Sequence, residues 1–263
     1  MNRILMTHLY FGDPRGEFSG KLAETLLDAG ADILEVGIPY ADPVCDGEVF
    51  QRACKRALEN GITPIKVLEG IRKIRDKGYK QKIYLTSYYG PIFKIGIEKF
   101  VQNAKKAGVD GLIVPDILLE EQKELQLACR RYGLSVIQFA TVYSTRERLK
   151  EIIKSSTDLP AQAGFIYCVS IPGVTGDGAD NKKLVKLVKL IKSVKSITKK
   201  PIYVGFGIKS PIEVKNILQM GADGVIVGSA IARIYEENIA DSFKSLPKIS
   251  TFIKTLKEST ISL

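Results

Sequence analysis

The stretch AGADILEVG at residues 29–37 decides the fold, because the chain repeats its pattern twice. The copies read AGVDGLIVPD at residues 107–116 and MGADGVIVGS at residues 220–229. In each copy a glycine follows an amphipathic segment, which is the position at which glycine commonly ends a helix. A short apolar run rich in β-branched residues comes next, as expected of a parallel strand that is covered on both faces. Each copy therefore predicts the end of a helix and a buried parallel strand.

Other strand-like runs fill the gaps between the copies and bring the count to eight. They lie at residues 4–9, 82–86, 135–139, 164–169 and 201–205. Helical patterns separate the strands, for example at residues 17–29, 65–76, 97–107 and 120–132. This alternation predicts an α/β fold, a single (β/α)8 TIM barrel whose parallel eight-stranded sheet is closed, in one domain over residues 1–263. An open doubly wound sheet is the alternative, but only Gly12-Asp13-Pro14 follows the first strand in place of a G-x-G-x-x-G turn.

Composition excludes several classes of protein. The chain has 263 residues, which suits one barrel of roughly 250 residues. Its four cysteines form no C-x-x-C pair and its sole histidine lacks a metal-ligand partner at the usual spacing, so we expect no metal and a reduced, cytoplasmic protein. We see neither a signal peptide nor an apolar run long enough to span a membrane.

The net charge of +10 has two interpretations, nucleic-acid binding or a lysine-rich solvated surface. At residues 182–192 the apolar positions form one helical stripe, so the lysines between them face water. No basic stretch is interleaved with aromatic residues. We therefore expect no nucleic-acid partner, although the charge can help to steer an anionic substrate.

Three glycine-containing loops follow the last three predicted strands. They read GVTG at residues 173–176, GFGI at residues 205–208 and GSAI at residues 228–231. Barrels of this kind carry their active sites at the carboxyl ends of the strands and often hold phosphate in the last loops. Glycine allows the backbone to approach phosphate closely, and a helix that begins near Ser229 favours an anion. A single such loop is more often a plain turn, but the three together predict a phosphate site.

Glu35 interrupts an apolar run, and a buried carboxylate without a partner is unfavourable. It is either one half of a salt bridge at the strand end or a general acid/base whose pKa is raised by its surroundings. Asp42 and Asp46 follow in the next loop, where each alone could belong to a turn. With Glu35 they predict a carboxylate cluster opposite the phosphate end.

The motif LEVGIPYADPVCDG at residues 34–47 closely resembles the signature of the tryptophan synthase alpha subunit family. The resemblance extends to residues 12–14, 88–91, 108–116, 167–176, 205–207 and 228–229, and thus over nearly the whole chain. It implies retro-aldol cleavage of indole-3-glycerol phosphate to indole and glyceraldehyde 3-phosphate.

The resemblance also implies a role for individual residues. Glu35 is expected to be the acid/base, and Asp46 to hold the indole N–H. The expected substrate-binding residues are Tyr167, Thr175, Gly176, Gly207, Gly228 and Ser229. Asp42 and Pro39 are expected at the interface with a beta subunit in an α2β2 complex. The chain itself then needs no metal or organic cofactor, and pyridoxal phosphate is expected in the beta subunit.

His8 departs from the family pattern, because it stands where an aromatic residue (Phe or Tyr) usually faces the substrate. The imidazole could pack on the indole or act as a second titrating group. Two other functions stay open beside the main one. The chain could be a stand-alone lyase that releases free indole, or a degenerate homologue that only binds and activates a beta subunit.

Overall fold

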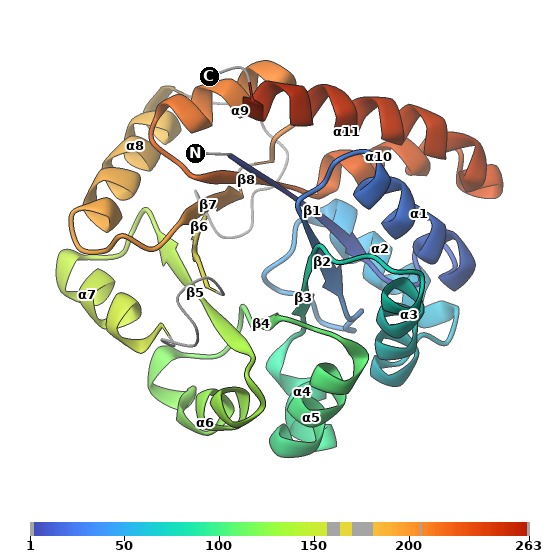
Figure 1. Cartoon of the computed structure of the whole chain (residues 1–263), viewed down its shortest axis with the longest axis horizontal. Coiled ribbons are helices and arrows are strands. Elements are labelled where there is room, and N and C mark those ends of the chain that lie inside the picture. Colours follow the sequence, from blue (N-terminus) through green and yellow to red (C-terminus); the bar gives the residue numbers. More distant parts are fainter. Residues whose placement is uncertain (1–2, 157–163, 170–180, 206, 262–263) are drawn as a thin grey trace.

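Eight parallel strands close into a barrel that a ring of helices surrounds (Figure 1). The computed structural model describes residues 3–156, 164–169, 181–205 and 207–261. Thr175 and Gly176, and with them the loop at residues 173–176, lie outside the described residues. Each strand pairs with the next in the chain and the last pairs with the first, which confirms the predicted closed sheet.

All eight predicted strands are present, with small changes at their ends. They are β1 (Ile4–Tyr10), β2 (Ile33–Gly37), β3 (Lys82–Thr86), β4 (Gly111–Ile113), β5 (Ser135–Thr141), β6 (Ile166–Val169), β7 (Ile202–Gly205) and β8 (Gly224–Val227). Strands β1 and β5 extend beyond the prediction at their carboxyl ends, whereas β6 and β7 begin later than predicted.

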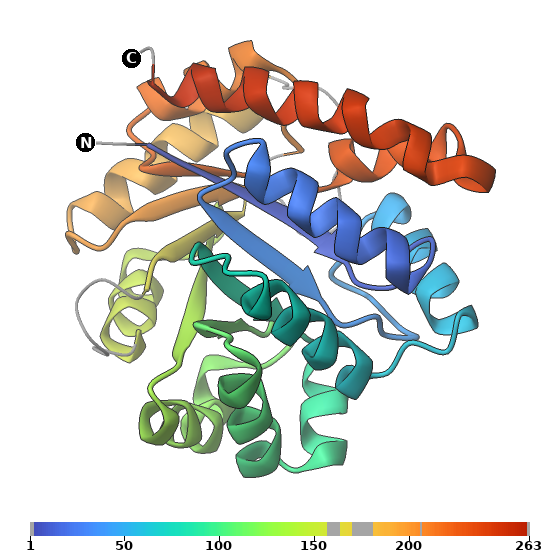
Figure 2. The same ribbon diagram turned by 45° about the vertical axis from the view of Figure 1, so that its right-hand side comes forward.

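The helices lie outside the barrel, and α11 packs across α1 and α9 (Figure 2). They are α1 (Gly16–Asp28), α2 (Glu48–Glu59), α3 (Pro64–Asp76), α4 (Tyr89–Ile95), α5 (Ile97–Ala107), α6 (Lys123–Tyr132), α7 (Arg146–Ser155), α8 (Asn181–Lys195), α9 (Pro211–Gln219), α10 (Ser229–Glu236) and α11 (Leu246–Ile261). The predicted helix at residues 120–132 is wrong at its start. Leu119–Glu121 forms a tighter 3₁₀ turn there, with i to i+3 hydrogen bonds. Within the described ranges, no helix has the length and apolar character needed to cross a membrane.

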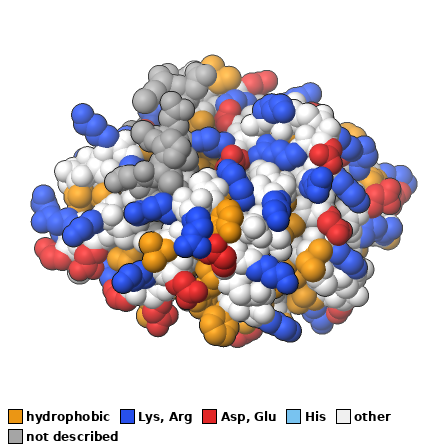
Figure 3. Space-filling model, turned by 60° about the horizontal axis from the view of Figure 1, so that its bottom comes forward, with side chains coloured by type: hydrophobic (Ala, Val, Ile, Leu, Met, Phe, Trp, Pro, Cys, Tyr) orange, Lys and Arg blue, Asp and Glu red, His pale blue; other side chains and the backbone are white. Residues whose placement is uncertain are grey.

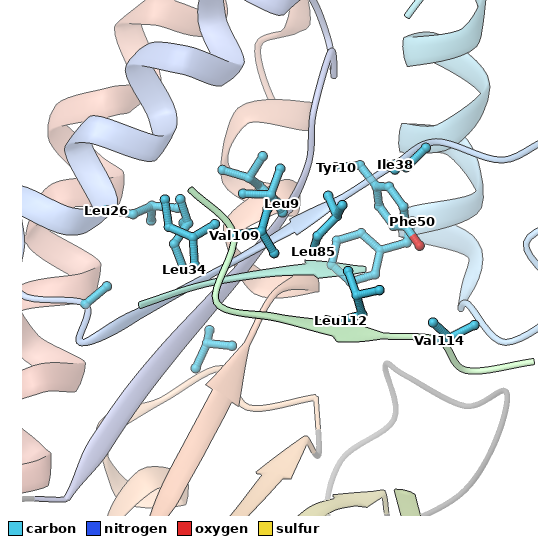
Figure 4. Close-up of a cluster of buried hydrophobic side chains, with 14 of the residues drawn as sticks. Leu9, Tyr10, Leu26, Leu34, Ile38, Phe50, Leu85, Val109, Leu112 and Val114 are labelled. Atoms are coloured by element: carbon cyan, nitrogen blue, oxygen red, sulfur yellow. The ribbon is translucent and has the colours of Figure 1, made fainter. Parts of the chain in front are cut away.

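The core has two layers, because successive residues of a strand point to opposite faces of the sheet. Inside the barrel, Met6, Ile33, Tyr84, Ile137 and neighbours pack together. The other strand face packs against the helices in a larger cluster. Figure 4 labels some of its strand residues, among them Leu9, Leu34, Leu85 and Leu112.

The aspartate of each repeated stretch joins two neighbouring strands at their amino ends. Its carboxylate accepts a hydrogen bond from the backbone N–H of a residue at the start of the preceding strand. Its own backbone N–H donates to the carbonyl oxygen of that strand residue. The carboxylate contacts are Asp32 to Leu5 at 2.7 Å, Asp110 to Ile83 at 2.8 Å and Asp223 to Ile202 at 3.0 Å. The preceding glycines Gly30, Gly108 and Gly221 have φ of 105°, 91° and 104°, which confirms their predicted helix-ending role. The repeat therefore locks pairs of strands into register.

Candidate active site

Polar side chains enter the barrel just beyond the inner core. His8 on β1, Glu35 on β2 and Thr86 on β3 each lie two positions after an inner-core residue, and therefore on the same face of the sheet. His8 and Glu35 are partners in the register of β1 and β2. All three line a cavity of about 220 Å³. Their positions near the strand ends place this cavity at the carboxyl end of the barrel, as predicted.

Glu35 is buried, with 2 % of its surface exposed. Its Oε1 accepts a hydrogen bond from Thr86 Oγ1 at 2.6 Å, whereas Oε2 is buried without a partner among the described residues. Burial raises the pKa of Glu35 to about 7, although the Thr86 hydrogen bond opposes this shift. Near neutral pH the group can therefore both release and accept a proton.

The salt-bridge alternative for Glu35 depends on the charge of His8. His8 Nδ1 lies 3.4 Å from Glu35 Oε1. Burial lowers the pKa of His8 to about 4, although the charge of Asp46 opposes this shift. The imidazole is therefore neutral near pH 7, and the contact is not an ion pair at that pH. The neutral imidazole therefore favours the acid/base interpretation of Glu35.

Asp46 lines the same cavity and is held by two tyrosines. Its Oδ2 accepts hydrogen bonds from the hydroxyl groups of Tyr10 at 2.6 Å and Tyr88 at 2.7 Å. Burial raises the pKa of Asp46 above its ordinary value, although these two hydrogen bonds oppose the rise. Asp46 is thus oriented by residues from β1 and from the segment after β3.

The cavity does not include Asp42, so the expected cluster holds two carboxylates and not three. Asp42 is exposed and lines a separate surface cleft of about 540 Å³. Pro39 is buried. After the buried Pro39 the loop turns outward, so that Asp42 lies at the surface, and it returns to the cavity at Asp46. That path could not be read from the spacing of the acids alone.

Aromatic rings form much of the remaining cavity wall. The His8 ring centre lies 4.6 Å from that of Phe50 on α2 and 5.1 Å from that of Tyr10. Phe139 on β5 and Tyr167 on β6 contribute from the opposite wall of the barrel, with ring centres 5.0 Å apart. Burial raises the pKa of Tyr167 well above its ordinary value, and the carboxylates of the cavity add to this shift. Such walls suit a flat apolar group.

The glycine-rich part of the cavity comes from β7 and β8. Gly205, Gly207, Gly228 and Ser229 all line it, as predicted from the loops at residues 205–208 and 228–231. Helix α10 begins at Ser229, so its first amides have no acceptor within the helix. A Cβ on Gly228 would lie 2.6 Å from the Phe50 ring, so a larger residue at this position would have to displace that ring.

Several cavity residues were not singled out from the sequence, and some of them had left a signal. Thr86 is a polar residue at the end of a predicted strand, and Tyr10 directly follows one, so the two-residue period could have placed both at the mouth. Phe50 lies on a helix, and its contacts with His8 and Tyr10 on β1 depend on packing that no local pattern encodes. Tyr88 does not line the cavity but reaches Asp46 from another loop, a contact that depends on packing in the same way.

The surface agrees with the solvated interpretation of the basic charge. On the face shown in Figure 3, Lys and Arg side chains are spread out and mixed with Asp and Glu. In the part of the chain that the structure describes, no group of three or more His, Cys, Asp or Glu side chains could hold a metal ion.

Comparison with known proteins gives one family. Residues 1–261 match the family model described as tryptophan synthase alpha chain. The tryptophan synthase alpha chain of Petrotoga mobilis is 37% identical over 257 residues, which cover 97% of this chain and 95% of that protein. Among solved structures, a chain of Mycobacterium tuberculosis tryptophan synthase matches with a TM-score of 0.87 at 31% identity, covering 98% of this chain and 93% of that chain. The alpha subunit from Legionella pneumophila also matches with a TM-score of 0.87, at 30% identity over 99% of this chain and 94% of its own.

Proposed function

The chain belongs to the tryptophan synthase alpha chain family, and we propose that it catalyses the alpha reaction, the carbon–carbon lyase step that converts indole-3-glycerol phosphate to indole and glyceraldehyde 3-phosphate. One observation carries the proposal. A single cavity is lined by a buried carboxyl group with a pKa of about 7, aromatic walls and the glycine-rich start of a helix. These three features match the reacting carbon, the indole and the phosphate of the substrate.

Glu35 is proposed as the acid/base of the cleavage. Protonation of indole C3 weakens its bond to the glycerol carbon, and removal of the proton from the hydroxyl group on that carbon forms the aldehyde as the bond breaks. The bonding electrons return to the indole ring, the proton added at C3 stays on the indole, and the hydroxyl proton passes to the acid/base. A carboxyl group that titrates near pH 7 suits these transfers. Oε2 is the oxygen proposed to exchange protons, because Thr86 holds Oε1.

Asp46 is proposed to bind the indole N–H. When C3 is protonated, positive charge develops at that nitrogen, and an oriented carboxylate stabilises it. Tyr10 and Tyr88 both donate to Oδ2, which leaves Oδ1 without a hydrogen bond from the described residues. Tyr167 and His8 are proposed to pack beside the substrate, since both line the cavity.

The phosphate is proposed to bind at Gly207, Gly228 and Ser229, together with Thr175 and Gly176, which lie outside the described residues. The free amides and the dipole at the start of α10 support this placement. Inorganic phosphate should therefore compete with the substrate.

We further propose a beta subunit as partner, in an α2β2 complex in which the pyridoxal phosphate belongs to that subunit. The segments that follow β2, β3 and β4 lie at the cavity end of the barrel. They carry exposed apolar side chains at Val44 (64 %), Phe93 (69 %) and Leu118 (61 %), beside the exposed Asp42. Exposed apolar groups on one face suit a protein interface.

Indole formation from indole-3-glycerol phosphate, measured with and without a beta subunit, tests the proposal. We expect slow turnover by the free chain and faster turnover in the complex, and Glu35→Gln should abolish cleavage while inorganic phosphate still binds. Full activity of the free chain would instead identify a stand-alone lyase. No indole under either condition would leave only a binding or activating role.

A further inference from the structure

His8 lies in direct contact with the proposed acid/base. The two residues are register partners on β1 and β2, and His8 Nδ1 lies 3.4 Å from Glu35 Oε1. The same oxygen accepts the Thr86 hydroxyl from the opposite neighbouring strand at 2.6 Å. Oε1 therefore has a polar neighbour on each side, while Oε2 has none among the described residues.

The imidazole has little freedom to leave this position. Its ring packs against Phe50 and Tyr10. A Cβ on Gly37 would lie 3.1 Å from its Nε2, and a Cβ on Gly228 would lie 3.2 Å from its Cβ. Close packing on several sides keeps a side chain in one rotamer, so Nδ1 stays beside the carboxyl group.

A neutral imidazole can adapt to either state of its neighbour. One ring nitrogen carries a proton and the other accepts one, and the two can exchange these roles. With its proton on Nδ1, the ring donates to Oε1 of a carboxylate. It donates to the same oxygen when the carboxyl proton resides on Oε2, the oxygen proposed to exchange protons. A phenylalanine ring at this position would fill similar space but could not donate.

We propose that His8 is a positioning residue for Glu35, whose imidazole holds Oε1 of the carboxyl group in both protonation states and leaves Oε2 to the substrate. The inference deepens the proposed function and rests on it for the identity of the substrate. The contact with Glu35 itself is independent of any substrate.

Other titratable groups near the pair come from several elements. They are Tyr10 on β1, Cys45 and Asp46 after β2, Tyr88 after β3, Tyr167 on β6 and, on α2 near Tyr10, Cys54. Of these only Asp46 is a carboxyl group; its charge raises the pKa of His8, and the charge of Glu35 raises the pKa of Asp46. A change in the His8 ring that follows protonation of Glu35 must therefore be distinguished from one that follows protonation of Asp46.

The sole histidine of the chain permits a direct measurement. In an untagged protein labelled with ¹⁵N-histidine, the two ring nitrogens are assigned without ambiguity. We expect the Nδ1–H tautomer on both sides of about pH 7, with a shift of the Nδ1 resonance as Glu35 takes up its proton, because the acceptor Oε1 then loses its negative charge. Glu35→Gln should remove this shift, whereas Asp46→Asn should keep it. An Nε2–H tautomer above pH 7, or a shift that persists in Glu35→Gln, would overturn the inference.

Kinetics of indole formation test the consequence for the reaction. His8→Phe keeps a ring against Phe50 and should lower kcat about tenfold with little change in KM, the loss expected for one contact to a charged group. The acid limb of its pH profile should move to higher pH. His8→Asn places a polar atom near the position of Nδ1 and should return the acid limb of the pH profile to its wild-type position. An unchanged kcat and pH profile in His8→Phe would contradict positioning. An inactive wild-type enzyme would refute the proposed function and leave the NMR test intact.

Discussion

Replacing Glu35 with Gln should stabilise the protein at alkaline pH and have little effect at acid pH. The glutamine keeps the size of the side chain and can still accept the Thr86 hydrogen bond, but it carries no charge. In the wild-type protein, Glu35 must ionise inside the barrel, where burial raises its pKa from 4.5 to about 7. Ionisation is therefore less favourable in the folded chain than in the unfolded chain.

The magnitude follows from proton linkage. Each unit of pKa difference corresponds to about 1.4 kcal/mol, so a rise from 4.5 to about 7 corresponds to about 3 kcal/mol. Because the folded pKa is the higher one, the full stability is present below pH 4.5 and is lost as the pH rises through about 7. The difference between Glu35→Gln and wild type should grow from near zero to about 3 kcal/mol across this window.

His8 acts in the opposite direction over an overlapping range. Burial lowers its pKa from 6.5 to about 4, so the unfolded chain binds the additional proton and stability falls as the pH drops through this range. The pH dependence of the wild-type protein alone would mix the two effects. Both proteins contain His8, so the difference between them isolates Glu35.

Urea-induced unfolding followed by circular dichroism, at several values between about pH 5 and 9, measures this difference. Glu69→Gln is the matched control, because Glu69 is exposed on α3 and should follow the wild type at every pH. If Glu35→Gln and the wild type showed the same dependence on pH, Glu35 would ionise as easily in the folded chain as in water. The acid/base argument would then lose its physical basis.

Three further substitutions test other parts of the structure. Gly228→Ala brings a Cβ to 2.6 Å from the Phe50 ring and should raise both KM and the inhibition constant of inorganic phosphate. Gly20→Ala is the control: its added Cβ meets nothing within 4 Å, so neither constant should change. Tyr88→Phe removes one of the two hydrogen bonds to Asp46 and should lower kcat/KM by about tenfold or less in the indole assay; an unchanged value would show that Tyr10 alone orients the carboxylate. Asp110→Ala removes the acceptor of the Ile83 N–H and of Arg75 and should lower the free energy of unfolding by about 1–3 kcal/mol, and a smaller loss in urea unfolding would deny the strand-locking role of the repeat.

The sequence by itself determined the order of strands and helices. These elements depend on patterns of neighbouring residues, such as the glycine and the apolar run of each repeat, and such patterns can be read locally. It also singled out Glu35, because a carboxylate inside an apolar run needs an explanation wherever the chain folds. The glycines after β7 and β8 were found in the same way, since parallel strands of a barrel end on one face.

Only the tertiary structure decided which side chains meet. The loop after β2 brings Asp46 into the cavity and leaves Asp42 at the surface. Tyr10 and Tyr88 hold Asp46 from segments more than thirty residues away along the chain. The proton affinities of Glu35 and His8 likewise depend on burial, on the Thr86 hydrogen bond to Glu35 and on the charge of Asp46 near His8. Distance and desolvation arise from the packing of segments far apart in the chain, so no local pattern of residues can specify them.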